Sequence, residues 1–231
     1  VLSEPPVFTE LLLDTSLDRA QKREGIAGLV SAITVAVPGR HDLVVKWNAW
    51  DIFQWELLQD LYPEVPSLML VRDPVEILAS HHRQAGRHMS GDPSLAGASP
   101  VFCCGRSSQP FVSMLDHRMR VLQALMEQMR GLHESQGVPV LHYSQLGAGA
   151  MEQIARRFGL HASEAARQRI AVRLSQHAKA LDQRFSPDGQ DKAAVFGASD
   201  RQDIEARLGP LHAQLLQCAQ PLMDAEALHA A

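Results

Sequence analysis

The chain has 231 residues, a length that suits one sizeable domain with a single core. Its net charge of −4 argues against a general nucleic-acid surface, so a bound anion would be held by a few placed groups. No apolar run approaches the roughly 20 residues that span a bilayer. The composition is that of a soluble globular protein with no membrane span.

Cysteine usage and the start of the chain bear on where the protein works. The three cysteines are odd in number and two are adjacent, which argues against a disulfide framework and favours a cytoplasmic protein. They are Cys103, Cys104 and Cys218, and we interpret them as buried or loop thiols. No signal-peptide pattern opens the chain. Because it begins without methionine and "VLSEPP" already resembles the end of a strand, we expect its true N-terminus upstream.

Short apolar runs with β-branched residues alternate with helical patterns through the first part of the chain. Such runs are typical of buried parallel strands. The predicted strands are residues 1–3, 43–47, 67–71 and 138–143. The helical patterns among them are residues 23–37, 49–62 and 73–86. This alternation predicts an α/β fold with a mostly parallel sheet.

The remainder of the chain is predicted to be mostly helical. Residues 87–109 are rich in Gly, Ser, Pro and Ala and form a predicted long loop, the kind of segment that often shapes a binding site. A second polar loop is predicted at residues 184–197. The predicted helices are residues 111–137, 149–160, 163–181 and a last one from about 199. We therefore expect a helix-rich C-terminal half.

An arginine stands at the end of the predicted strand 67–71, in "LMLVRDPVEILASHHRQ". Asp73 is a good helix N-cap and Pro74 suits the first helical position, so Arg72 lies between a strand end and a helix. Ligands of open α/β sheets bind at that edge. Ser80 falls on the same helix face as the cap, so Arg72 and Ser80 could close on one phosphate. From spacing alone, the alternative is a capped helix with a surface arginine and a small serine.

The same stretch resembles the 3′-phosphate-binding segment of sulfotransferases that use 3′-phosphoadenosine 5′-phosphosulfate (PAPS), where Arg-Asp-Pro follows a strand and a helix carries a serine eight residues on. Other segments resemble that family in the right order, and the likeness is to its bacterial branch. "VLSEPPVF" is similar to the segment after the family's first helix, and "LVVKWNAWD" to its next strand. "VLHYSQL" is similar to its Tyr-x-x-Leu strand end, and "RFSPDGQDK" to its late basic loop.

The resemblance implies a three-layer P-loop-type domain over residues 1–231, truncated at its N-terminus. The family's 5′-phosphosulfate loop lies on the first strand, and no such loop precedes "VLSEPP" here. The implied reaction is transfer of a sulfuryl group from PAPS to a hydroxyl or amine acceptor, and without that loop this chain alone is expected to be incomplete as an enzyme. The acceptor is a small molecule, a glycan or a lipid, and no metal is expected, because the 11 histidines are scattered.

The resemblance also assigns roles to single residues. Arg72 and Ser80 would hold the 3′-phosphate of PAPS. Lys46 would contact the sulfuryl group, and an ammonium at the end of a buried strand is costly without an anion. Glu4 would be the general base, since Asn48 stands where many relatives carry a histidine; its alternative role is that of a turn residue before Pro5.

Two further alternatives stay open from the sequence. Lys192, in the "SPDGQDK" loop, either binds the nucleotide phosphates or is a solvated surface lysine. The rival functions are a P-loop kinase-like phosphotransferase, which would need a Walker lysine and a magnesium ligand, and a degenerate non-catalytic nucleotide-binding or scaffold module.

Overall fold

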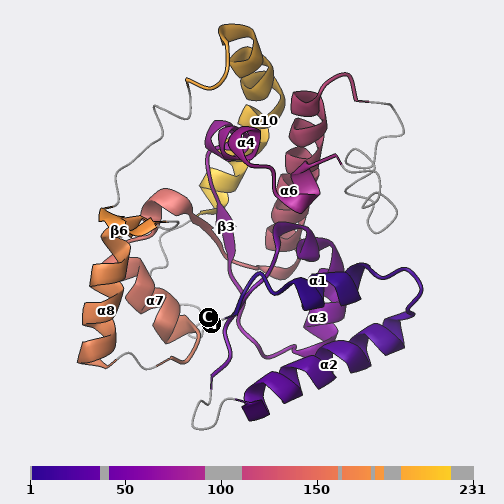
Figure 1. Cartoon of the computed structure of the whole chain (residues 1–231), viewed down its shortest axis with the longest axis vertical. Helices are drawn as coiled ribbons and strands as arrows, with labels where there is room; N and C mark the ends of the chain where they lie inside the picture. The colour runs from indigo at the N-terminus through magenta and orange to yellow at the C-terminus, as the bar shows by residue number, and fades with distance from the viewer. Residues whose placement is uncertain are drawn as a thin grey trace. The chain divides into compact units, whose positions relative to one another are not determined.

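The fold is seen in a computed structural model of the whole chain (Figure 1). The structure describes residues 2–36, 42–91, 111–160, 163–177, 180–184 and 194–219. It divides into two compact units, each of which is built from two separate stretches of the chain. The first unit comprises Val1–Val65 and Ala85–Gln128, and the second comprises Pro66–Gln84 and Met129–Ala231.

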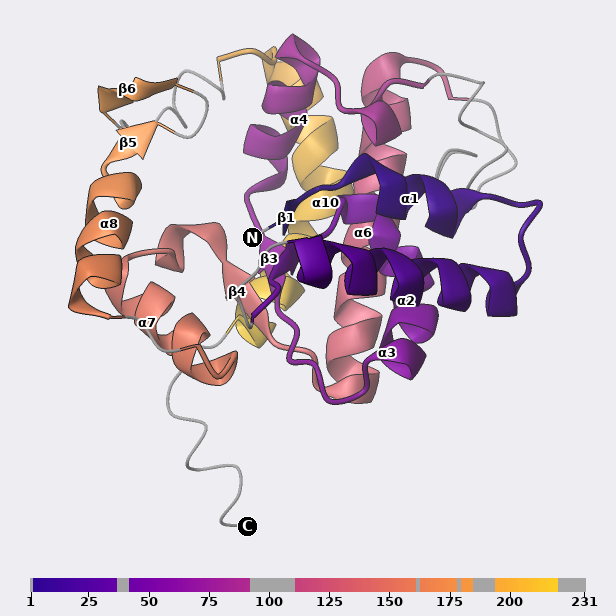
Figure 2. The ribbon, with the colours of Figure 1, turned by 60° about the horizontal axis from the view of Figure 1, so that its bottom comes forward.

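The first unit holds one parallel strand pair and most of the N-terminal helices. Its strands are β1 (Leu2–Ser3) and β2 (Val45–Lys46), which run parallel with Leu2 opposite Val45. Its helices are α1 (Pro6–Leu13), α2 (Arg19–Ala36), the 3₁₀ turn η1 (Ala49–Gln54), α3 (Trp55–Leu61), η2 (Arg87–Met89) and the first part of α6 (Met114–Gln136). Helix α2 packs against both α1 and α3, as Figure 2 shows.

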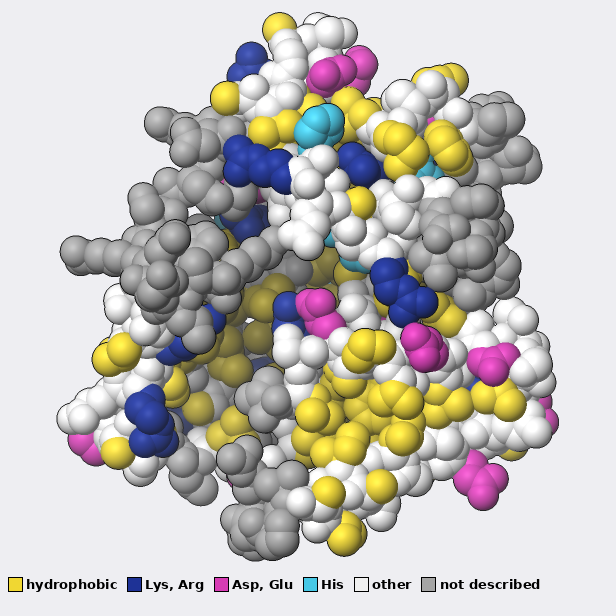
Figure 3. Space-filling model, in the orientation of Figure 1, with side chains coloured by type: hydrophobic (Ala, Val, Ile, Leu, Met, Phe, Trp, Pro, Cys, Tyr) yellow, Lys and Arg dark blue, Asp and Glu magenta, His cyan; other side chains and the backbone are white. Residues whose placement is uncertain are grey.

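A small apolar core joins these helices to the strand pair. Phe8, Leu12, Ile26 and Leu57 form a buried cluster, with partly buried side chains from β1, β2, α2 and α3 around it. Figure 3 shows hydrophobic side chains gathered over α1, α2 and α3. Of the residues on α2, Ile26 is fully buried, whereas Val35 remains 77% exposed. The helix is therefore anchored by one stripe of its surface.

The second unit holds the other parallel pair and the C-terminal helices. Strands β3 (Met69–Val71) and β4 (Val140–His142) run parallel, with Val71 opposite His142. Its other elements are α4 (Pro74–Arg83), the end of α6, η3 (Tyr143–Gln145), α7 (Ala148–Arg157), α8 (Glu164–Leu174), β5 (Gln176–His177), β6 (Ala180–Arg184) and α10 (Ala198–Cys218). Helix α10 packs against α4 and β4.

Burial on α10 follows the helical repeat. Ile204, Leu208, Leu211 and Leu215 are the buried residues of this helix, and their spacing of four, three and four places them on one face. This face supplies the core of the second unit together with buried residues of α4, β3 and β4: Met69, Val71, Leu78, Ala79, Val140 and Leu141.

The predicted alternation of strands and helices is confirmed in its coarse form. All four predicted strands are present, each shortened to two or three residues, and they form two parallel pairs. One prediction is wrong in detail, and one helix is missing from the predictions. Helix α8 ends at Leu174 rather than at 181, and the chain then forms an antiparallel hairpin of β5 and β6. Helix α1 was not predicted from the sequence at all.

The finer architecture stays a prediction. The described strands support a mixed α/β fold with short parallel pairs, whereas one central sheet in three layers and a single domain stay predictions. Within the described residues, no helix is long and apolar enough to cross a membrane. The long loop predicted at 87–109 lies largely outside those residues, and so do Cys103 and Cys104.

Candidate functional site

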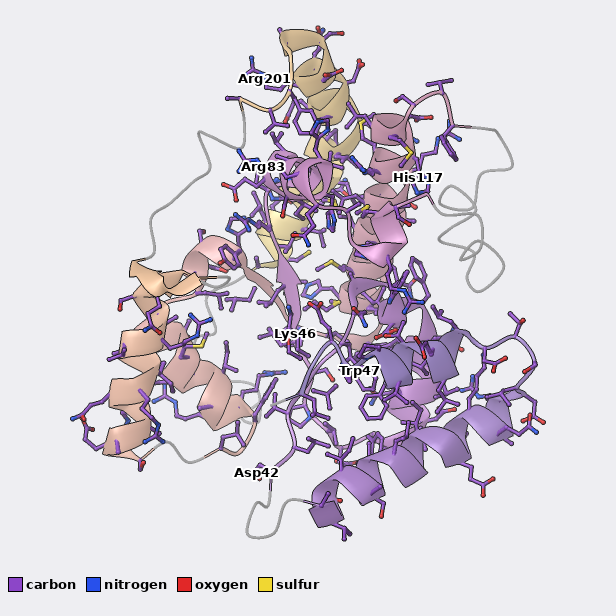
Figure 4. The ribbon with its side chains drawn as sticks, in the orientation of Figure 1. Asp42, Lys46, Trp47, Arg83, His117 and Arg201 are labelled. Atoms are coloured by element: carbon purple, nitrogen blue, oxygen red, sulfur yellow. The ribbon has the colours of Figure 1, made fainter. Side chains whose placement is uncertain are left out.

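Glu4 and Lys46 meet at the carboxyl ends of the parallel strands β1 and β2. The Lys46 ammonium donates to the Glu4 carboxylate in an ion pair, and the Glu4 backbone N–H donates to the Lys46 carbonyl at 2.6 Å. The prediction that Lys46 ends a buried strand is wrong at the strand end itself, because the Lys46 side chain is 59% exposed and the Glu4 side chain is 46% exposed. Its neighbour Trp47 instead turns to the core, with its ring 5.3 Å from that of Phe8 (Figure 4). Successive strand residues point to opposite faces, so Lys46 faces away from the core.

Glu4 has an unusual backbone conformation. Its φ is +50°, and it is the one non-glycine residue of the described chain with a positive φ. A residue that has a β-carbon adopts this left-handed region at a cost of order 1–3 kcal/mol, so the surrounding structure must hold it there. The backbone hydrogen bond to Lys46 and the following Pro5 and Pro6 supply that constraint. Such strain gathers at functional sites, which directs attention to this strand edge.

A buried carboxyl group lies close to the same strand edge. Asp51, on η1, is 1% exposed. Its Oδ2 accepts hydrogen bonds from the Thr9 hydroxyl at 3.0 Å and from the Asn48 backbone N–H at 2.9 Å. The Asn48 side-chain amide donates in turn to the Thr9 hydroxyl at 2.5 Å. The three side chains form one network that joins α1 to the turn after β2.

Burial raises the pKa of the Asp51 carboxyl from its ordinary 3.8 to about 6. The hydrogen bonds from Thr9 and Asn48 act in the opposite direction, and the nearby charge of Glu4 adds to the rise. Because the folded pKa is the higher one, the folded protein keeps a proton between about pH 4 and 6 that the unfolded chain has already released.

The contribution of Asp51 to the free energy of unfolding is expected to fall by about 3 kcal/mol as the pH rises through this window. Asp51→Asn cannot titrate and should remove that slope. Urea unfolding of the parent and of Asp51→Asn, measured between about pH 4 and 7, checks this prediction. Equal slopes in the two proteins would show that Asp51 titrates normally in the fold.

Arg72 belongs to the second unit. As the sequence predicts, it lies directly after β3 and before α4. Asp73 caps α4 by accepting the Glu76 backbone N–H at 3.0 Å, and Pro74 is the first helical residue. The Arg72 guanidinium does not extend freely into solvent. The Nε and Nη2 atoms of Arg72 each lie 2.5 Å from Glu76 Oε2. The central guanidinium carbon, Cζ, lies 4.6 Å from the centre of the Tyr143 ring. The guanidinium is thus oriented by a carboxylate and an aromatic face.

The other predicted site residues do not all belong to the same compact unit. Ser80 lies on α4 and is half-buried, in the same unit as Arg72. Lys192 lies outside the described residues. Glu4 and Lys46 belong to the first unit, whereas Arg72 and Ser80 belong to the second.

Sequence reasoning missed two histidines in the second unit. His142 ends β4 and His212 lies on α10, with their ring centres 5.8 Å apart. His142 Nδ1 lies 2.6 Å from the Ser144 hydroxyl, and within the described residues neither Nε2 atom has a hydrogen-bond partner. Burial lowers the pKa of His212, while the charge of Asp73 opposes this change. No sequence spacing could indicate a pair of residues that lie so far apart in the chain.

No arrangement in the described chain suggests a metal centre, because no group of three or more His, Cys, Asp or Glu residues there is placed to hold an ion.

Comparisons of the chain with protein-family models, with curated proteins and with solved structures found no match.

Proposed function

We propose that the chain binds PAPS and transfers its sulfuryl group to a hydroxyl or amine acceptor. The observation that carries this proposal is the position of Arg72, at the carboxyl end of a parallel strand and directly before the Asp73-capped helix that bears Ser80. Ligands of α/β proteins bind at such edges. An arginine fork and a hydroxyl are suitable donors for a phosphate group, and the 3′-phosphate distinguishes PAPS from common nucleotides.

The reaction would be an in-line displacement at sulfur. The acceptor oxygen or nitrogen forms the new bond to sulfur, the bond from sulfur to the 5′-phosphate oxygen breaks, and the leaving group is 3′-phosphoadenosine 5′-phosphate. Catalysis of this kind depends on positioning and on charge stabilisation. Glu4 would accept the proton of the acceptor, and the Lys46 ammonium would stabilise negative charge on the sulfuryl and bridging oxygens. The exposure of both side chains leaves them open to a substrate.

The contacts of Arg72 support a binding role in a specific way. A guanidinium held by Glu76 and by the Tyr143 ring loses less side-chain entropy on meeting a phosphate than an unconstrained one. The side chain is also only 28% exposed, so its interactions are screened less by solvent than those of a surface arginine.

The test is a comparison of two ligands. Charge-assisted hydrogen bonds contribute about 1.5–3 kcal/mol each, so Arg72→Ala should weaken binding of 3′,5′-diphosphoadenosine by roughly 10- to 150-fold. Binding of adenosine 5′-phosphate, which has no 3′-phosphate, should change little. Isothermal titration calorimetry with both ligands measures the two affinities.

A matched control comes from the same helix. Arg83, in the last turn of α4, is exposed and carries the same charge, so Arg83→Ala should leave both affinities nearly unchanged (Figure 4). Equal losses for both ligands in Arg72→Ala would contradict the 3′-phosphate assignment. Tight diphosphate binding without any sulfuryl transfer would favour a non-catalytic nucleotide-binding module instead.

A further inference from the structure

Asp51 connects two segments that are far apart in the chain. Its Oδ2 accepts from Asn48, three residues before it, and from Thr9, 42 residues away on α1. The hydrogen bond from Asn48 is a local helix-capping contact. The hydrogen bond from Thr9 has no role in the cap, and Thr9 is itself 1% exposed. A buried hydroxyl and a buried carboxyl that satisfy each other are costly to place and costly to separate.

The two connected segments are those that carry Glu4 and Lys46. Glu4 lies just before α1, five residues ahead of Thr9, and only Pro5 separates it from Pro6, the first residue of the helix. Lys46 ends β2, two residues ahead of Asn48. A displacement of α1 relative to the turn after β2 would therefore separate the Glu4 carboxylate from the Lys46 ammonium. Proline restricts the backbone, so such a displacement would be transmitted through residues 5 and 6 rather than absorbed by them.

We infer that Asp51 is a positioning residue which, through its hydrogen bonds with Thr9 and Asn48, fixes the distance between Glu4 and Lys46. The expected effect of this positioning on kcat rests on the proposed function. The expected effect on the distance between Glu4 and Lys46 rests on the geometry of the first unit alone. Strand pairing between β1 and β2 involves only two residues on each side, and the hydrogen bond from the Glu4 N–H to the Lys46 carbonyl constrains the two backbones but not the two side chains. The Thr9–Asp51–Asn48 network supplies a second constraint at the carboxyl ends of the strands.

The sharpest variant removes one hydroxyl. Thr9→Val keeps the shape of the side chain and removes the hydrogen bond to Asp51, whereas Thr9→Ser keeps the hydroxyl. Misplacement of a catalytic group by about 1 Å can cost on the order of 100-fold in rate. We expect Thr9→Val to lower kcat for sulfuryl transfer about 10- to 100-fold with little change in the KM for PAPS. Thr9→Ser, which keeps the hydroxyl, should retain most of the parent kcat.

A control variant separates a loss of kcat caused by misplaced catalytic side chains from one caused by lower stability of the fold. Ile26→Val, in the same core but outside the network, should cost about 0.5–1.5 kcal/mol of unfolding free energy and leave kcat unchanged. If Ile26→Val and Thr9→Val lower kcat equally, Asp51 has only a structural role and the inference is overturned.

A second measurement needs no activity. The exposed Lys46 amine can be acylated, and its pairing with Glu4 protects it, so Thr9→Val should accelerate acylation of Lys46 several-fold over the rate in the parent, as followed by mass spectrometry. Thr9→Ser should restore the parent rate. An unchanged Lys46 rate in Thr9→Val overturns the inference. If the full-length parent protein shows no sulfuryl transfer, the proposed function fails, and the acylation rates still decide the role of Asp51.

Discussion

In the full-length protein, Glu4→Gln is expected to lower kcat for sulfuryl transfer by about 10²–10⁴-fold, the usual contribution of a positioned general base. The glutamine amide keeps the shape of the side chain and can still contact the Lys46 ammonium, but it cannot accept a proton at neutral pH. Affinity for 3′,5′-diphosphoadenosine should stay near the parent value, because the proposed nucleotide contacts lie on Arg72 and Ser80. Steady-state kinetics together with calorimetry of the diphosphate measure the two quantities separately.

The matched control is Glu10→Gln on the neighbouring helix α1. Glu10 is also an exposed carboxylate with a cationic partner, Arg87 at 3.3 Å, and its neutralisation should leave kcat within a few-fold of the parent. Parent-like turnover of Glu4→Gln would show that Glu4 serves only the turn before Pro5. Equal losses in both variants would indicate a general effect of removing negative charge from this face.

Leu208→Ala is expected to destabilise the second unit strongly. Leu208 is 0% exposed and lies at the centre of the buried face of α10. Truncation of a fully buried leucine costs about 2–5 kcal/mol, because both the burial of the removed atoms and the packing around them are lost. Since α10 packs against α4, which follows Arg72, we also expect weaker diphosphate binding near the unfolding transition.

Leu216→Ala provides the comparison on the same helix. Leu216 is 41% exposed, so its truncation should change the unfolding free energy by about 0.5 kcal/mol or less. Chemical denaturation of both variants and the parent gives the two values. A small loss for Leu208→Ala would mean that α10 contributes little to the core of the second unit.

The sequence by itself determined the local elements well where local physical chemistry dominates. The Asp-Pro pair after an apolar run places the end of a strand and the start of a helix, because a carboxylate caps the free N–H groups and proline has none to lose. The structure has Asp73 and Pro74 in those roles. The helix predicted at 163–181 failed beyond Leu174, because the hairpin of β5 and β6 depends on pairing between strands, which propensity alone does not report.

Only the tertiary structure decided which side chains meet. Lys46 was predicted to end a buried strand, but Val45 of β2 and Trp47 just after it pack against the core and leave Lys46 to pair with Glu4. Arg72 was located correctly by sequence, yet its contact with Tyr143, 71 residues later, arises from the parallel pairing of β3 and β4.

Asp51 is the clearest case of this division. Its sequence neighbourhood indicates no more than a helix-capping acid, and its burial, its hydrogen bond from Thr9 and its raised pKa all come from the packing of α1 against η1. A hydrogen bond between residues that lie far apart in the chain forms only when the fold brings them together. The desolvation of the Asp51 carboxyl depends on which side chains cover it in that fold. The sequence determines which residues can take part in such a network, and the fold determines which of them do.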